Sequence, residues 1–347
     1  SRSIGFNSSG VALKQIIVTY SDSAKTSQIG VKVIDNSSIS ASGNVGTRVI
    51  TNYANVTFVG GDSTKDVATY TSPLDRQTIT TDSFDNRGNS KHQTVLSEGY
   101  VSGVWTFSSM QDMTNSNIDI YDQTGTSIVK SYSSATIGVA SFIGLDEVNY
   151  TKYDKFGNVE TQNVKSYIDE AKTTLKEYKE VVNTFADDVS RKRGNAETST
   201  VSRWTAVTKL DSQWIDRTVM TTTSFDTLGR SVDQTQDIYV YNGTALQQAF
   251  HNVIKNLSYD NRGDAGIQQI TSYKVVSAAN VLVDYKVFTN RNYDASHNIT
   301  NQMILTYANP TDTTPLDVQE TRSVGFNSSG VALKQIIVTY SDSAKTS

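Results

Sequence analysis

The sequence contains no cysteine, which excludes disulfide bonds, thiolate zinc sites and cysteine nucleophiles. It also has only three prolines among 347 residues. Because proline interrupts the hydrogen bonds of a sheet, its scarcity leaves room for long strands. No apolar run approaches the roughly 18 to 20 residues that a membrane-spanning helix needs. We therefore expect no membrane span in this segment.

An excess of charge of one sign is also lacking, since 31 Lys and Arg face 35 Asp and Glu and the net charge is −4. The basic residues are scattered, whereas a nucleic-acid surface gathers them on one face, so nucleic acid is not an expected partner. Tyr is abundant, with 18 residues, and Ser, Thr, Asn and Val are conspicuous. This composition, with 21 glycines to form turns, is typical of many short strands.

The two ends of the chain are nearly the same sequence. Ser1–Ser27 recurs at Thr321–Ser347 with two differences, at an offset of 320 residues. A globular domain has no reason to end by restarting its first strands, so we predict a repeat array. Residues 1–320 form one module, residues 321–347 begin the next, and the parent protein is expected to be longer.

A shorter repeat divides the module. Its recognisable element is an aromatic residue, Asp or Asn, two free positions and Gly, as in FDNRG, YDKFG and FDTLG. Weaker copies at Ile39 (ISASG) and Ser190 (SRKRG) keep the Gly but lose the aromatic and the acid, and His297 replaces Gly after Tyr293. The first residues of these elements, which we call anchors, are Phe6, Ile39, Phe84, Tyr121, Tyr153, Ser190, Phe225, Tyr259 and Tyr293. About nine units therefore fill one module.

Two further positions recur in the frame of the anchors. Nine residues after an anchor the residue is usually Gln, and fourteen residues after it there is usually an aromatic residue, which we call the late aromatic. The glutamines are Gln15, Gln93, Gln162, Gln234, Gln268, Gln302 and Gln335. The late aromatics are Tyr20, Tyr53, Tyr167, Trp204, Tyr239, Tyr273, Tyr307 and Tyr340. Glu98 and Ala135 break the aromatic pattern, but both weak copies keep it, which indicates that they are true units.

The Asp-x-x-Gly element predicts a tight turn. The Asp or Asn side chain accepts a backbone N–H bond two residues on, and Gly takes the left-handed conformation that closes a type I turn with a G1 bulge. Runs such as VALKQIIVTY then predict strands of about ten residues, and second turns near Gly103, Gly243 and Ala278 return the chain to the next anchor. Each unit is thus a predicted β-hairpin. The predicted turn and ladder residues are Phe6, Gly10, Gln15, Tyr20, Phe84, Asp85, Gly88, Gln93, Tyr121, Asp122, Gly125, Tyr153, Asp154, Gly157, Gln162, Tyr167, Phe225, Asp226, Gly229, Gln234, Tyr239, Tyr259, Asp260, Gly263, Gln268, Tyr273, Tyr293, Asp294, Gln302 and Tyr307.

The predicted fold is all-β, with tandem β-hairpins in one continuous antiparallel ribbon that is wound into a solenoid, tube or shell. Equivalent residues should stack along the sheet, anchor aromatic on anchor aromatic, with the glutamines hydrogen-bonded to their neighbours. The segment Lys165–Phe185 also has the spacing of an amphipathic helix, but its register with the repeat favours a strand. The long unit at Ile39 is expected to carry an extended loop around Gly60.

Several of these segments, including FDNRGNSKHQ, YDKFGNVETQ and FDTLGRSVDQ, resemble the YD repeats of Rhs and teneurin-type proteins. The resemblance implies a ribbon of β-hairpins that spirals into a hollow shell, which encloses a toxin or forms part of an adhesion receptor. The present units are longer, near 35 residues rather than about 20. They also add the Gln and late-aromatic positions, and no protease-like or toxin segment is present.

No catalytic, metal or cofactor site is indicated. His92, His251 and His297 lack the spacing of a metal motif, and no GxSxG, P-loop or dinucleotide fingerprint occurs. The recurrent acids offer calcium ligands or glycosidase carboxylates as alternatives, but turn chemistry already requires an acid at each of these positions. The Tyr and Gln ladders offer a weak case for carbohydrate binding, and sheet cohesion is the favoured interpretation. We therefore expect no enzyme and no cofactor.

The leading hypothesis is a structural repeat segment of a giant extracellular or cell-surface protein that forms a filament, tube or sheath. Its expected partners are adjacent copies of the module in the same chain, with lateral contacts to other chains as an alternative. Two other functions remain open. One is the stalk of an adhesin or surface receptor, and the other is a shell that encapsulates a toxin.

Overall fold

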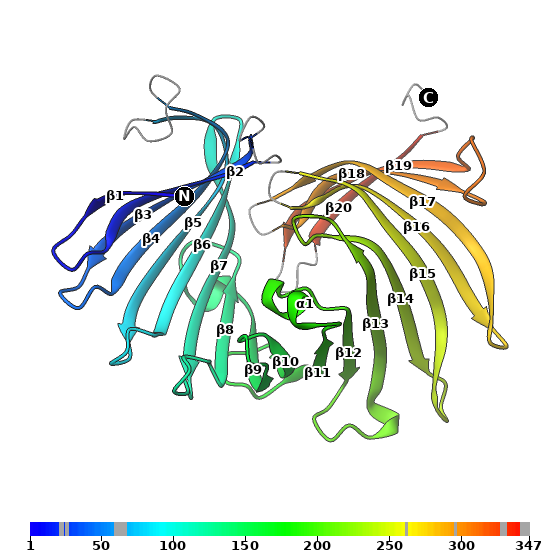
Figure 1. The fold of residues 1–347 in the computed structure, drawn as a ribbon. Coiled ribbons are helices and arrows are strands. Elements are labelled where there is room, and N and C mark those ends of the chain that lie inside the picture. Colours follow the sequence, from blue (N-terminus) through cyan, green and yellow to red (C-terminus); the bar gives the residue numbers. More distant parts are fainter. Residues whose placement is uncertain are drawn as a thin grey trace.

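A computed structural model describes residues 1–20, 24, 28–58, 68–260, 263–294, 297–326 and 332–340 of the chain. The described residues form one antiparallel sheet of 20 strands, in which each strand pairs with the strand before it and the strand after it in sequence (Figure 1). The predicted all-β ribbon of consecutive hairpins is confirmed, and the sheet does not close into a barrel.

The strands are long and the helices are few. The first ten strands are β1 (Arg2–Phe6), β2 (Ala12–Tyr20), β3 (Gln28–Ile39), β4 (Val45–Phe58), β5 (Ala68–Phe84), β6 (Ser90–Val101), β7 (Val104–Ser116), β8 (Thr126–Tyr132), β9 (Phe142–Tyr153) and β10 (Val159–Tyr167). The next ten are β11 (Leu175–Thr184), β12 (Thr198–Trp204), β13 (Trp214–Phe225), β14 (Ser231–Tyr241), β15 (Leu246–Tyr259), β16 (Ala265–Val276), β17 (Ala279–Tyr293), β18 (Ile299–Tyr307), β19 (Asp317–Phe326) and β20 (Ala332–Tyr340). Among the described residues, the helical elements are α1 (Asp188–Arg193) and the 3-10 turns η2 (Val139–Ser141) and η3 (Asp211–Gln213).

The segment Lys165–Phe185 is extended, as the repeat frame predicts. β10 ends at Tyr167 and β11 begins at Leu175, so the helical alternative is wrong. The alternating burial along these strands comes from two faces of a sheet, which a short window cannot distinguish from a helical stripe. The extended loop expected around Gly60 and the turn after Phe326 lie outside the described residues.

The sheet is a single layer for most of its length. The chain exposes 18,335 Å² for a mass of 38.0 kDa, whereas a compact monomer of that mass would expose about 14,000 Å². Most strand residues are therefore only half-buried. A cluster of buried apolar side chains lies on β2, β3 and β4, in which Ile16, Val31, Val33 and Val56 are each at most 4% exposed.

The ribbon curves until later strands approach earlier ones. Cα atoms of β7 and β19, which are twelve strands apart, lie within 8 Å of one another. One pocket is lined by Leu74 and Tyr100 from the first half together with Asp260 and Tyr293 from the second half. Figure 1 shows the two halves of the sheet facing each other across the centre. His297, which precedes β18, lines a pocket with Asn52 of β4 and Leu74 of β5. The sheet thus passes itself without closing.

Candidate functional site: the Asp–Gly turns

The anchor turns share one backbone pattern. In the turn at Asp85, the Asp85 N–H donates to the Asn89 carbonyl (2.9 Å) and the Gly88 N–H donates to the Asp85 carbonyl (3.1 Å). Gly88 has a φ of +91°, which a residue with a side chain rarely adopts. The same two backbone bonds recur in the turns that begin at Asn7, Ser40, Asp154, Asp226, Asp260 and Asp294. We call this edge of the ribbon the Asp–Gly rim.

The acid at the start of each turn holds the loop together with its side chain. Asp154 Oδ1 accepts the N–H groups of Phe156 (2.8 Å) and Asn158 (2.9 Å), and its Oδ2 accepts the Asn158 side-chain amide (2.8 Å). Only 4% of the Asp154 side chain is exposed. Burial alone would raise its pKa, but the hydrogen bonds from Asn158, Phe156 and Arg191 together lower that pKa to about 2. Asp154 therefore stays ionised and fixed.

Two departures from the motif keep the geometry. In the weak copy at Ile39, the Ser40 hydroxyl accepts the Asn44 N–H (3.0 Å) as an Asp would, and Gly43 keeps a φ of +87°. In the last full unit His297 takes the glycine position with a φ of +63°, and its N–H donates to the Asp294 carbonyl (3.1 Å). The turn therefore tolerates substitution at either end.

The unit assigned to Tyr121 turns three residues earlier than the motif indicates. Asp119 is the turn acid, since its Oδ1 accepts the N–H groups of Tyr121 (2.8 Å) and Gln123 (3.0 Å). Asp122, expected to be that acid, instead fills the glycine position with a φ of +63°, and Gly125 lies beyond the turn. Tyr121 is 75% exposed rather than an anchor. The motif YDQTG misled because Asp also tolerates the left-handed conformation.

The corrected frame removes an exception in the repeat. With the anchor at Ile118, the late-aromatic position moves from Ala135 to Tyr132, which is 3% exposed and ends β8. The spacing to Phe84 and Tyr153 becomes 34 and 35 residues. The unit is thus more regular than the sequence motif suggested.

The weak copy at Ser190 contains a helix where a tight turn was predicted. The Asp187 side chain accepts the Ser190 N–H (2.7 Å) and caps α1, which ends at Gly194 in a left-handed conformation. The segment SRKRG is therefore the body and C-cap of α1. The hairpin is preserved, because β11, which precedes the helix, pairs with β12, which follows it. Trp204 ends β12.

Neighbouring turns are bonded to each other along the Asp–Gly rim. The Asn89 side chain donates to Asp122 (2.7 Å), and the Asn158 side chain donates to the Arg191 carbonyl (2.6 Å) in the next unit. Further links of the same kind join Ser9 to Ala41, Arg87 to Asp122, Lys155 to Asp188, Arg191 to Asp154, and His297 to Asp264. The rim is thus a chain of polar contacts between successive units.

The anchor tyrosines use their hydroxyl groups to reach the previous unit. Tyr153 donates to the Thr124 carbonyl (2.7 Å) and Tyr293 to the Ala265 carbonyl (2.7 Å). Tyr259 also bonds to the preceding hairpin through its hydroxyl. The prediction that anchors stack on anchors is wrong for the described residues, whose ring pairs include no two anchors. Two strand spacings, about 10 Å, separate successive anchors, which is beyond ring contact.

The recurrent glutamines bond to the strand before them. Gln15 donates to Ser3 (3.3 Å), and Gln335 makes the same contact to Ser323 (3.3 Å). Gln234 donates to Thr222 (3.1 Å). In each pair the acceptor lies twelve residues before the glutamine. Gln93 differs, since it donates to the Met113 sulfur on β7 (3.8 Å), and Gln162 lies opposite Tyr150 and Val181 in the sheet.

In the second half of the chain these contacts form a continuous ladder. Asn256 donates to Gln234 (3.4 Å) and Gln268 donates to Asn256 (2.7 Å). Arg291 then donates to both Gln268 (3.1 Å) and Gln302 (3.2 Å). The ladder crosses β14 to β18, so it ties five strands together through side chains as well as backbone.

The late aromatics mark a recurrent β-bulge, which the sequence analysis did not identify. The register shifts at the late position in eight strands, namely at Tyr20, Tyr53, Glu98, Tyr132, Tyr167, Trp204, Tyr239 and Tyr273. Glu98 shows that the bulge does not require an aromatic residue. Because a bulge bends and twists its strand, one at the same place in these eight strands adds to the curvature of the ribbon.

The ring at the late position packs on a ring of an adjacent strand. Tyr53 lies 5.1 Å from Tyr70, and Trp204 lies 4.2 Å from Trp214, measured between ring centroids. Tyr132 packs in the same way on Phe142 of the next strand, whereas Tyr273 and Tyr307 pack on His251 and Tyr285 of the strand before. These contacts are between adjacent strands of one sheet, so they stabilise the curvature.

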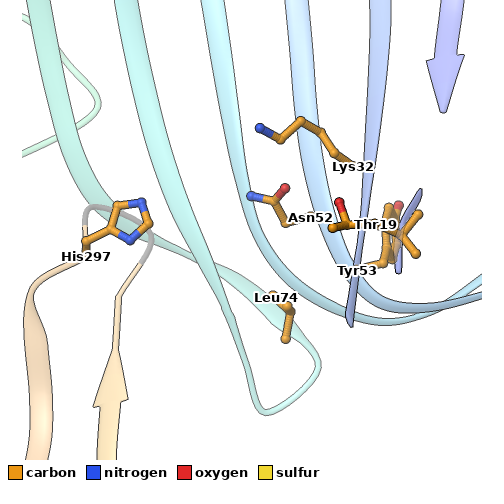
Figure 2. Close-up of a pocket in the computed structure, with 8 residues that line it drawn as sticks. Thr19, Lys32, Asn52, Tyr53, Leu74 and His297 are labelled. Atoms are coloured by element: carbon orange, nitrogen blue, oxygen red, sulfur yellow. The ribbon is translucent and has the colours of Figure 1, made fainter. Parts of the chain in front are cut away.

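Polar grooves lie where the two halves of the sheet approach each other. Figure 2 shows one of them, with His297 on one side and Asn52 and Leu74 on the other. His297 is exposed, and its ring nitrogen lies 2.8 Å from Asp264.

His92 lies between two acids. It contacts Asp82 (2.7 Å) and Asp112 (2.6 Å), and the hydrogen bond to Asp82 is the main cause that raises the pKa of His92.

Within the described ranges, no three His, Cys, Asp or Glu side chains are grouped as metal ligands. In the same part of the chain, the helices are too short and polar to cross a bilayer. No protein-family model matches the sequence, and no match is found among curated proteins. The recurrent geometry is therefore that of a bonded ladder, with no arrangement among the described residues that assigns a reaction.

Proposed function

We propose that this chain is a structural segment of a repeat protein, in which the ribbon continues from copy to copy and builds the wall of a tube or filament. One observation carries the proposal. The hairpin β19–β20 repeats the pairing of β1–β2, with Ser323 opposite Gln335 as Ser3 is opposite Gln15. The repeated segment thus continues the same sheet, since β19 pairs with both β18 and β20, and this continuity supports a module that begins there.

The curvature supports a wound ribbon. β7 and β19 approach within 8 Å after twelve strands, yet the sheet remains open. A ribbon of constant curvature that passes itself without closing follows a helix. Successive windings then meet edge to edge, as they do at the grooves around His297 and Tyr293.

The proposed location is outside the cell or on its surface. The abundance of Ser, Thr and Asn supports a large secreted structural protein. The resemblance to YD repeats rests on the Asp–Gly turns, whose hydrogen bonds recur from unit to unit. It supports a hollow ribbon architecture.

Electron microscopy of chains that contain one, two or three copies of residues 1–320 in series tests this proposal. We expect particles of constant width whose length increases by the same step with each copy. Separate beads joined by linkers would contradict a continuous wall. Closed particles of fixed size would favour the shell, and a rod that carries a distinct end domain in the native protein would favour the adhesin stalk.

A further inference from the structure

The strands β2 and β20 have the same sequence, ALKQIIVTY, but different surroundings. Each pairs with the strand before it in the same register, since Lys14 faces Ile4 and Lys334 faces Val324. On its other side β2 pairs with β3, whereas among the described strands β20 is the last in the sheet. The two strands therefore show one surface in a covered state and in an uncovered state.

The uncovered copy exposes its apolar side chains more fully than the covered copy does. Ile16 on β2 is 1% exposed, and its counterpart Ile336 on β20 is 45% exposed. The neighbouring Ile337 and Val338 are 57% and 41% exposed. Such a row beside the unpaired backbone of an edge strand favours the addition of another strand.

The first half of the chain shows what covers this surface. Val31 and Val33 of β3 and Val56 of β4 form one cluster with Ile16. A charge pair adds to it, because Lys14 lies 3.2 Å from Asp35 of β3. The cover is therefore the hairpin 28–58, with two valines over the isoleucine and an acid beside the lysine.

We propose that the free edge of β20 is a binding site for the hairpin 28–58 of a further copy of this module. The added strand lies antiparallel to β20 in the register of the β2–β3 pair. In that register the copy of Asp35 meets Lys334, and the copies of Val31 and Val33 cover Ile336. This inference rests on the proposed function and names the surface by which one module recognises the next.

The opposite edge of the sheet has a different partner. β1 corresponds to the end of β19, and β19 pairs with β18, so that Arg322 faces Asn301. The edge of β1 therefore fits a strand like β18, whereas the edge of β20 fits a strand like β3. The two sheet edges fit different strands. Modules can therefore join through the β20 edge in one orientation only.

The test appends the sequence of residues 28–58 after Ser347, which restores the order that follows Ser27. We expect backbone amides in the fragment Ile336–Val338 to exchange with deuterium at least about 10-fold more slowly than in the chain that ends at Ser347. Unchanged exchange in this fragment would overturn the proposal.

A matched chain carries Val31→Asp and Val33→Asp in the appended hairpin only. It should lose most of the added protection, since it keeps the backbone but not the apolar cover. Equal protection by this control would also overturn the proposal. The result is separable from the proposed function: uniform filaments formed by three-copy chains, without protection of β20 in the extended chain, would remove only the edge site.

Discussion

The turns at the two ends of the strands differ in chemistry, although they connect the same strands. On the Asp–Gly rim the turns repeat the same backbone bonds and link to their neighbours. On the opposite edge, which we call the far rim, the connections vary from the tight turn at Ser277 and Ala278 to the long connection 133–141 that contains η2. One rim therefore sets the repeat, and the other is free to vary.

One pair of acids allows a direct comparison of the rims. Asp154 on the Asp–Gly rim and Asp169 on the far rim each accept two backbone N–H groups of their own turn. Asp154 also accepts from Arg191 of the next turn (3.2 Å). The local chemistry is the same, but only Asp154 is bonded to a neighbouring unit by these contacts.

The largest effect is expected for Asp154→Ala. The change removes the acceptor for two backbone N–H groups and for Arg191, and it should lower the free energy of unfolding by about 3 kcal/mol. Urea denaturation followed by circular dichroism measures this loss. Asp169→Ala is the matched control and should cost clearly less. Equal losses in the two variants would mean that links between turns add no stability.

The second effect is a dependence on pH. The pKa of Asp154 is about 2 in the folded chain, below its ordinary value of 3.8, so its contribution is present above pH 4 and is lost as pH falls toward 2. Asp154→Asn should keep the turn, as Asn7 does in the first unit. The difference in unfolding free energy between wild type and variant should shrink by up to about 2 kcal/mol between pH 5 and pH 2. A constant difference across that range would contradict the assignment.

A third comparison uses glycines on the two rims. Gly157 has a φ of +87°, whereas Gly138 on the far rim has an extended φ of 175°, and neither has a heavy atom within 4 Å of an added Cβ. Gly157→Ala should therefore cost about 1 kcal/mol through backbone strain alone. Gly138→Ala should be neutral or slightly stabilising. Matching thermal melting points for the two variants would disprove the left-handed turn.

The smallest effect is expected for Tyr153→Phe, which removes one hydroxyl bond to the Thr124 carbonyl. The cost should be about 0.5 to 1 kcal/mol, because the ring stays in place. Tyr121→Phe tests the corrected turn frame at the same time. Tyr121 is 75% exposed, so its hydroxyl should be dispensable. A larger loss at Tyr121 than at Tyr153 would restore the original frame.

The hairpin architecture could be predicted because its signal repeats. A single Asp-x-x-Gly motif is weak evidence for a hairpin. Its recurrence together with Gln and a late aromatic predicted the strands correctly even at Ile39, where Ser40 replaces the acid. The motif failed at Tyr121, where two acids compete for the turn. It also failed at Ser190, where a capped helix keeps the same length. In both places the local choice depends on backbone geometry that several residue types can adopt.

The sequence predicted a wound ribbon, but neither the bulges nor the number of strands after which the ribbon meets itself could be predicted from it. The late aromatic was visible as a pattern, but its position gave no sign that the strand register shifts there. The approach of Tyr293 to Tyr100 depends on small bends summed over many strands. Such long-range geometry has no local sequence signature.

The winding of the ribbon can be tested by one distance. Tyr100 and Asn292 line the same pocket, although they lie on β6 and β17. Because the chain has no cysteine, Tyr100→Cys and Asn292→Cys place spin labels at these two positions only. A flat ribbon would separate them by about 50 Å. Pulsed dipolar spectroscopy should give a narrow distribution well under half that distance, and a distribution centred near the flat-ribbon value would contradict the wound ribbon.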